Sequence, residues 1–411
     1  MRPALVLVFM IIMFDSPVYS MTMDDVAQYA INNNPELVAQ RLEERMARGQ
    51  LEKASLLLKA NPTIEGAVSK KERAPGEEGN KFTNYGFKLS QEFEIAGQRG
   101  ARIDIAEKEI STAVLVIKDK ERLLISEVKD SFGKVLALRK KSELAQEVVR
   151  LQEELLGLTK VKFQAGEVSG LDVNLAEVEL SKAKRELLLV EREYRESLLA
   201  LKGLMGLNPD MPLSVEGDLP SAIPNLPDKE VLKTVAFSER PDLKTVALEV
   251  RKTEAVIGLI NKETVPNVTL AGFYGKDEQK NEVGLTITIP LPFFDRKQGE
   301  RLEGRAKAEQ AKIKVDGLKR TIEREIEQAY TALESALEEL SIFKKEILNK
   351  AAENLNLLNL AFKEGKIGFF EVRLAQKETV DIQFAYLDSQ LRMRIALNAI
   401  EKVTGGSLKW Q

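Results

Sequence analysis

The sequence predicts a mainly α-helical protein with a small β part, built from two copies of one unit: a strand pair followed by a long coiled-coil helical hairpin. Three observations predict this fold. Two halves of the chain match at a constant spacing of 199 residues, apolar residues recur every three or four positions over long stretches, and segments ahead of those stretches alternate apolar with small or polar residues. Charged residues are 30% of the chain and aromatic residues 6%, a balance typical of long solvated helices.

The composition excludes several classes of function. The formal net charge of -3 gives no basic field, so we expect no nucleic-acid partner. The chain has neither Cys nor His, so it lacks disulfides, thiol nucleophiles and the commonest acid/base group and metal ligands. No Gly-rich phosphate loop and no isolated carboxylate pair stands out. We therefore expect no enzyme, no metal site and no cofactor, and any energy source must be external.

Residues 1–20 have the pattern of a secretory signal peptide. Arg2 provides a positive start, an apolar run covers residues 4–14, and residues 18–20 end in a small residue suited to cleavage. An uncleaved anchor is the alternative, which the shortness of the apolar run disfavours. We expect the mature chain to start near Met21.

The mature chain is predicted to divide into a first repeat at residues 21–206 and a second at 230–406. A linker at 207–229 joins them and holds five of the 14 prolines, and a short tail follows at 407–411. Each repeat opens with two helices separated by a turn, because Asn34-Pro35 and Arg240-Pro241 place proline where a helix can begin.

Two strands are predicted next in each repeat, at about 62–72 and 82–95 in the first and at about 265–275 and 282–292 in the second. The last of these alternates five branched apolar residues with small or hydroxylated ones, so one face suits lipid and the other water. Four strands cannot close a barrel, and their edges could not stay unpaired in hydrocarbon. Several chains must therefore combine.

A long helical hairpin completes each repeat, at about 98–206 with its tip near 166 and at about 298–406 with its tip near 365. Apolar residues from Val315 through Ile347 to Phe362 are spaced by three or four, as in a coiled-coil seam. A helix of sixty residues would reach about 90 Å and needs a lateral partner. Gly166 and Gly365 stand where the chain must reverse, because glycine accepts backbone angles closed to other residues.

These features resemble the TolC-like family of outer-membrane efflux proteins. The resemblance rests on the NPEL turn at residues 34–37, the duplicated F-x-x-G turn followed by an acid and Val, and the paired strands, and it covers the whole mature chain. Within that family, residues 91–99 and the segment IPLPFFDR at 289–296 resemble the subgroup that serves heavy-metal (cation) efflux pumps.

The resemblance implies a homotrimer with a twelve-stranded β-barrel in the outer membrane of a Gram-negative-type cell, continuous with a periplasmic α-helical barrel. It implies the channel component of a tripartite efflux pump, surrounded by outer-membrane lipid. A periplasmic adaptor (membrane fusion) protein would dock on the hairpin tips, and an inner-membrane transporter of the resistance-nodulation-division type would supply energy. Metal cations or small toxic compounds would then pass from periplasm to outside without chemistry.

The resemblance also implies site residues. The adaptor-docking residues would be Gly166, Val168, Ser169, Gly365, Ile367 and Gly368. Asp172 and Glu371 fall where related channels carry acids near the closed end of the pore; equally, they are helix N-terminal acids favoured by the helix dipole, and both interpretations stand open. Ile367 and Leu374 occupy positions where some relatives have charged gating residues, so that lock is not expected here.

Three other functions compete with an efflux channel. The outer-membrane duct of a type I protein secretion system fits the same fold. A periplasmic coiled-coil adaptor fits less well, because it should have one hairpin flanked by small β-domains rather than two hairpins each preceded by strands. A hydrolase is disfavoured because no catalytic constellation is visible. Phe163 and Phe362 are interpreted as packing anchors beneath the two turns.

Overall fold

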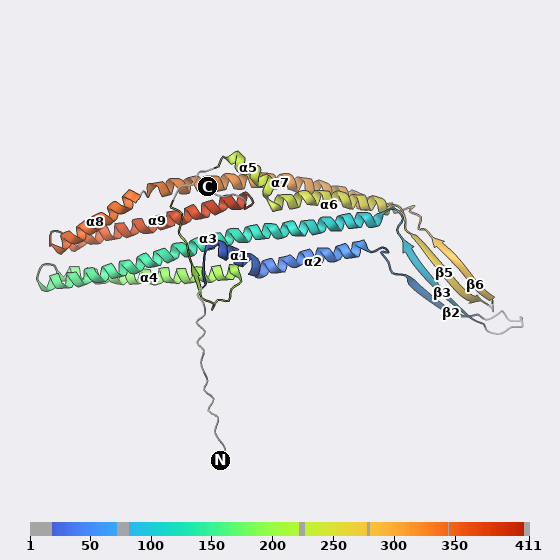
Figure 1. The fold of residues 1–411 in the computed structure, drawn as a ribbon, viewed down its shortest axis with the longest axis horizontal. Helices are drawn as coiled ribbons and strands as arrows, with labels where there is room; N and C mark the ends of the chain where they lie inside the picture. The colour runs from blue at the N-terminus through green and yellow to red at the C-terminus, as the bar shows by residue number, and fades with distance from the viewer. Residues whose placement is uncertain (1–18, 72–81, 222–226, 278–279, 344, 407–411) are drawn as a thin grey trace, which may run out of the picture. The chain divides into compact units, whose positions relative to one another are not determined.

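The computed structural model describes residues 19–71, 82–221, 227–277, 280–343 and 345–406 (Figure 1). Most of the expected signal peptide, the middle of the expected linker and the expected tail lie outside the described residues. The chain is mainly helical with a small β part, which confirms the predicted fold class.

The elements follow the predicted order, two helices, two strands and a long hairpin in each repeat. The helices are α1 Met23–Asn33, α2 Pro35–Ser55, α3 Gln98–Gln164, α4 Gly170–Met205, α5 Lys229–Glu239, α6 Pro241–Glu263, α7 Gln298–Ile342, α8 Lys345–Lys363 and α9 Phe369–Val403. The strands are β1 Tyr19–Met21, β2 Thr63–Lys71, β3 Phe82–Phe93, β4 Leu213–Val215, β5 Val268–Asp277 and β6 Lys280–Thr288.

The chain forms two compact units, and each unit takes segments from both repeats. Unit 1 comprises residues 1–38, 121–236 and 324–411, and unit 2 comprises residues 39–120 and 237–323. The sequence repeats are therefore not the compact units. Corresponding elements of the two repeats pack together instead, because neither strand pair nor hairpin can bury its apolar face alone.

Unit 2 contains an antiparallel sheet of order β2-β3-β5-β6, whose central ladder joins the two repeats. Val283, Leu285 and Ile287, which share one face of β6, are 80%, 89% and 66% exposed, so this face is apolar and uncovered among the described residues. β6 ends at Thr288, before the expected end at 292. Pro290 and Pro292 explain the earlier end, because proline has no amide N–H to extend a ladder.

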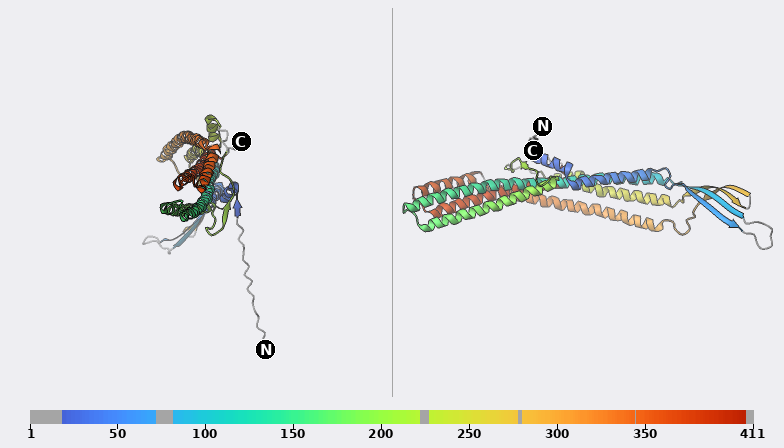
Figure 2. Two further views of the ribbon diagram at one scale, coloured as in Figure 1. Left: turned by 90° about the vertical axis from the view of Figure 1, so that its left-hand side faces the viewer. Right: turned by 90° about the horizontal axis from the view of Figure 1, so that it is seen from below.

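Unit 1 contains the parts of both hairpins that include the tips, within residues 121–236 and 324–411. Figures 1 and 2 show α3, α4, α8 and α9 running side by side in this unit. The first hairpin uses one unbroken helix, α3, whereas its counterpart is interrupted between Ile342 and Lys345. Ile347, which the spacing placed on the seam, is 43% exposed. Residues 331–350 contain neither Pro nor Gly, so the interruption has no local composition signal.

The linker contains an element that the sequence did not predict. β4 pairs in parallel with β1, and Val215 of β4 is almost fully buried. A three-residue strand is too short to show a period of two, which is why the pattern missed it. No helix in the described ranges is both long and apolar enough to cross a membrane.

Candidate functional site

The tip of the first hairpin is closed by a glycine in the left-handed region. Gly166 has φ 79°, its amide donates to the Phe163 carbonyl at 3.0 Å, and the Glu167 amide donates to the Lys162 carbonyl at 2.9 Å. This pair of bonds is the Schellman motif, which satisfies the last carbonyls of α3. The reversal at Gly166 thus follows from the backbone freedom of glycine.

The second tip repeats this geometry 199 residues later. Gly365 has φ 70°, its amide donates to the Phe362 carbonyl at 3.0 Å, and the Lys366 amide donates to the Ala361 carbonyl at 2.9 Å. The chain therefore presents two tips with the same backbone trace but different side chains.

The helices that leave the tips begin differently. Ser169 caps α4 in a capping box: its hydroxyl accepts from the Asp172 amide at 3.3 Å, and the Asp172 carboxylate accepts from the Ser169 amide at 2.9 Å. Gly368 caps α9 without a side chain, and Glu371 folds back so that a Cβ at residue 368 would lie 2.9 Å from its Oε2. Asp172 is thus fixed by its cap, whereas Glu371 is exposed.

The predicted tip residues lie mainly at the surface. Gly166, Ser169, Gly365 and Gly368 are exposed, while Val168, Ile367 and Asp172 are half-buried. Their exposure leaves them accessible to another molecule, and the structure places all of them in unit 1.

A core beneath the tips combines side chains from both hairpins. The rings of Phe362 and Phe369 are 1% and 2% exposed and lie 6.4 Å apart, and they pack with Leu155, Ala176 and Val372. Edge-to-face rings of this kind add to the stabilisation from burial.

The interpretation of the two anchor phenylalanines is half right. Phe362 is buried as expected, but Phe163 is 49% exposed and lies over Gly170 instead. The single-sequence pattern could not separate them, because they are equivalent in the repeat and differ only in their three-dimensional neighbours.

Lys162 is a tip residue that sequence reasoning missed. Its side chain is 8% exposed, and its Nζ lies 2.7 Å from Glu167 Oε2 and 5.6 Å from the centroid of the Phe362 ring. A lysine that pairs with one tip and lies over an aromatic ring of the other links the two hairpins. Its spacing from Leu155 and Thr159 on one helical face was the signal that could have identified it as buried.

Two polar contacts extend this link along the hairpins. Arg373 of α9 pairs with Glu179 of α4 at 2.8 Å, and Gln152 of α3 donates to Gln376 of α9 at 3.0 Å. Partial burial acts to raise the pKa of Glu179, but hydrogen bonds and charge from Lys182 and Arg373 outweigh it and hold that pKa below its usual range. The carboxylate therefore stays ionised in the folded chain.

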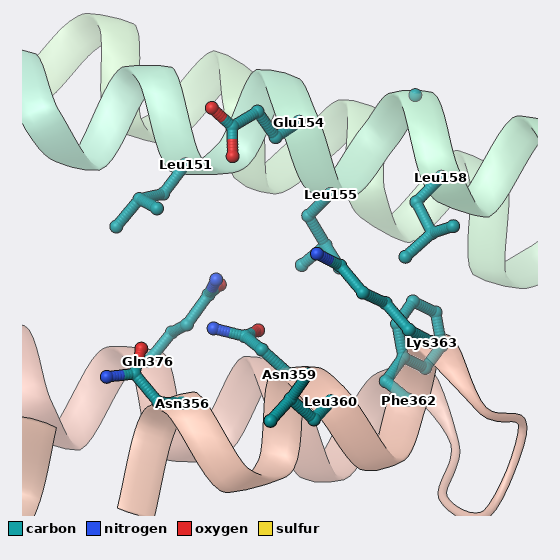
Figure 3. A pocket seen from close by; sticks show the side chains of 11 residues that line it. Leu151, Glu154, Leu155, Leu158, Asn356, Asn359, Leu360, Phe362, Lys363 and Gln376 are labelled. Atoms are coloured by element: carbon teal, nitrogen blue, oxygen red, sulfur yellow. The ribbon is translucent and has the colours of Figure 1, made fainter. Parts of the chain in front are cut away.

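A groove of about 640 Å³ lies between α3 and α8 close to the tips (Figure 3). Leu151, Leu155 and Leu158 form one wall, and Asn359 of α8 and Gln376 of α9 extend toward them. A leucine wall facing amide groups can receive apolar side chains and fix them with a few hydrogen bonds. Within the described ranges, no group of three or more His, Cys, Asp or Glu residues could hold a metal ion.

Comparison with known proteins matches nearly the whole chain. A family model described as outer membrane efflux protein matches residues 26–207 and 234–406. The cobalt-zinc-cadmium resistance protein CzcC of Cupriavidus metallidurans is 24% identical over 76% of this chain and 75% of its own length. The pyoverdine export outer membrane protein OpmQ of Pseudomonas aeruginosa is 24% identical over 95% of this chain and 85% of its own.

Solved structures show the same fold. CusC, in a study of its folding and transmembrane channel formation, aligns with a TM-score of 0.77 at 15% identity, over 94% of this chain and 92% of that one. The outer membrane protein VceC of Vibrio cholerae aligns with a TM-score of 0.69 at 15% identity, over 93% and 96%. The duplicated arrangement is therefore shared by chains of very different sequence.

Proposed function

The chain belongs to the outer membrane efflux protein family, and we propose that it is the outer-membrane channel of a tripartite efflux pump that passively conducts metal cations or small toxic compounds outward. The observation that carries the proposal is the pair of long hairpins with glycine-closed tips, each continuing from a strand of one shared sheet. A duct needs a long wall, and the two long hairpins supply the helices for one.

The assembly that fits is a homotrimer whose strands form a twelve-stranded barrel in the outer membrane and whose hairpins form a periplasmic tunnel. The bare apolar face of β6 and the free edges of the sheet support it, because an edge in hydrocarbon must find a partner strand. Each protomer would contribute four strands.

The hairpin tips are proposed to receive a periplasmic adaptor protein, with an inner-membrane transporter providing energy. The proposed docking residues are Gly166, Val168, Ser169, Gly365, Ile367 and Gly368. Their exposure and the groove between α3 and α8 support this, since an adaptor helix could lay apolar side chains between the two hairpins.

Asp172 and Glu371 are proposed to narrow the periplasmic end of the pore and favour cations. Both lie within the first turn after a tip, where the three chains of an assembly would bring several carboxylates together. Glu371 is the stronger candidate because the residue is exposed, whereas Asp172 is half-buried and its carboxylate accepts a hydrogen bond from Ser169.

Metal cations are the favoured substrates because several matched relatives are named as cobalt, zinc, cadmium or nickel resistance proteins. A deletion strain should lose resistance to one or more of these cations and regain it with the intact gene. An unchanged metal response together with a lost secreted protein would instead favour a type I secretion duct.

A further inference from the structure

The sheet of unit 2 has two free edges in the described chain, β2 on one side and β6 on the other (Figure 1). At each edge the chain passes between strand and helix through a link that is neither. Residues 56–62 link α2 to β2, and residues 289–297 link β6 to α7. These two links form neither strand hydrogen bonds nor helix packing, so neither kind of contact can join them to a neighbouring molecule.

Both links expose large apolar side chains. The leucine link, Leu56 to Leu58, has Leu57 80% exposed, and the phenylalanine link has Phe293 67% and Phe294 95% exposed. Contiguous bare side chains of this size mark surfaces that another molecule covers.

The turn between β6 and α7 has an equivalent in the first repeat, the turn between β3 and α3, which follows an interior strand of the sheet. Gly97 and Lys297 both have positive φ, 74° and 59°, and each precedes a glutamine that begins a helix. The side-chain oxygen of Gln98 accepts from the amide two residues earlier at 2.8 Å, and that of Gln298 does so at 2.7 Å. The two turns are therefore equivalent, at a spacing of 200 residues here instead of 199.

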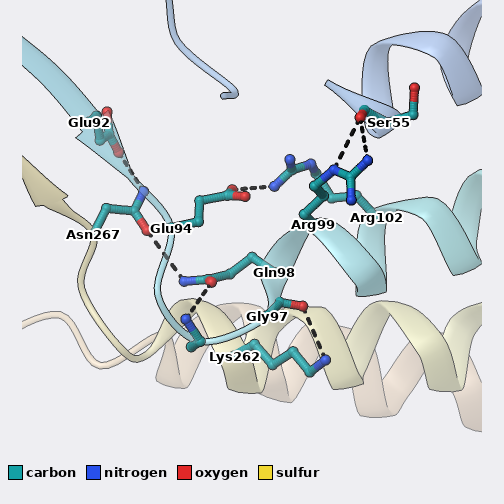
Figure 4. Close-up of polar contacts among 10 residues, drawn as sticks. Ser55, Glu92, Glu94, Gly97, Gln98, Arg99, Arg102, Lys262 and Asn267 are labelled. Atoms are coloured by element: carbon teal, nitrogen blue, oxygen red, sulfur yellow. Dashed lines mark hydrogen bonds and ion pairs between the residues drawn. The ribbon is translucent and has the colours of Figure 1, made fainter. Parts of the chain in front are cut away.

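At this spacing Glu94 corresponds to Phe294 and Arg102 to Leu302. Glu94 and Arg102 form an ion pair in which their side chains are only 11% and 14% exposed (Figure 4). Phe294 and Leu302 are 95% and 73% exposed. The two equivalent positions thus hold a mostly buried ion pair after the interior strand β3, but exposed apolar side chains after the edge strand β6.

The two links leave the sheet at the same end. Thr63, the first residue of β2, pairs with Ser90, and Ser90 pairs with Ala271. Ala271 in turn pairs with Thr286, two residues before β6 ends. Two apolar patches at one level on opposite edges of one sheet fit a head-to-tail contact between identical chains, which closes into a ring.

We propose that Phe293, Phe294 and Leu302 of one copy pack against Leu56 to Leu58 of the next copy and seal the wall where strands give way to helices. This seal rests on the proposed function, because it presupposes the oligomeric duct. A lipid covering suits Phe294 less well, since the patch continues through Leu302 onto the helical side of the turn.

The absence of Cys from the sequence makes the seal directly testable by cross-linking. The double variant Leu57→Cys with Phe294→Cys should form bonds between chains in isolated membranes, giving linked dimers and trimers, and neither single variant should. The matched control pairs Phe294→Cys with Ile95→Cys, because Ile95 is 60% exposed but follows the interior strand β3. It should give no linked oligomers.

A trimer that forms normally but shows no Leu57–Phe294 linkage, or links equally through the control, would overturn the seal and leave the proposed function intact. Absence of any trimer would count against the proposed function. The lipid alternative is tested by Phe294→Trp in a Trp410→Phe background: quenching by brominated lipids without cysteine linkage assigns the patch to the bilayer. In cells, Phe294→Ser with Leu57→Ser should increase uptake of a large antibiotic, and unchanged uptake would contradict the sealing role.

Discussion

Single residues decide how the hairpin tips are built. Gly166 and Gly365 hold positive φ angles that an L side chain adopts at a cost of about 1–2 kcal/mol. We expect Gly365→Ala to lower the free energy of unfolding by about 1 kcal/mol and to weaken adaptor binding. Chemical denaturation and adaptor pull-down measure the two effects. Gly317→Ala, within α7 and facing open space, is the control and should stabilise the chain slightly.

The two acids beside the tips differ in their contacts: Asp172 forms a capping box with Ser169, whereas Glu371 is exposed. Glu371→Lys should shift the reversal potential of single channels toward anions, because Glu371 is exposed and its charge near the proposed constriction would act on passing ions. Asp172→Asn should weaken the α4 cap by about 1 kcal/mol. If Glu371→Lys leaves ion selectivity unchanged in planar bilayers, the acid serves the helix terminus alone.

The Glu179–Arg373 contact makes the link between the hairpins sensitive to acid. Since the pKa of Glu179 is lowered in the folded chain, its stabilisation is present above the unfolded pKa, about 4.3, and is lost as the pH falls through the folded value. Glu179→Gln should therefore lower Tm at neutral pH but have little effect in acid. Glu378→Gln, at the equivalent exposed position, should change Tm little at either pH, and equal effects of both variants would exclude a specific role for the pair.

Among elements, the contact between α1 and the end of α4 leaves no room for a side chain. Gly206 ends α4 with φ 70°, and a Cβ there would lie 2.5 Å from the Asn33 carbonyl oxygen. Gly206→Ala should destabilise unit 1 by about 2 kcal/mol or more, because strain and a backbone clash combine. Gly203→Ala, one turn earlier with open space around it, should have no such cost in a thermal melt.

The elements also show how far periodicity predicts structure. It anticipated both strand pairs, both hairpins and the reversal at each glycine, since those depend on local spacing and backbone freedom. It missed the interruption after Ile342, the short strand β4 and the burial of Lys162. These features depend on which neighbouring helix or strand each residue meets, and a linear pattern does not contain that information.

At the scale of the whole molecule, both edges of the sheet lack a partner strand in the part of the chain that the structure describes. We expect the protein purified from outer-membrane fractions in mild detergent to have the mass of three chains by light scattering. Four strands cannot close a barrel, so neighbouring copies must pair their edges. The number three is what the resemblance to TolC-like channels implies. A stable monomer in that fraction would contradict the assembly.

The sequence by itself determined the duplicated strand-and-hairpin plan, the placement of the tips and the resemblance to outer-membrane efflux proteins, because periodicity and glycine spacing are written along the chain. Only the tertiary structure decided that the compact units mix the two repeats, that Lys162 and Phe362 join the hairpins, and that Phe294 is bare where Glu94 is paired. Burial and pairing depend on which segments meet in space, so equivalent residues of a repeat can have opposite surroundings.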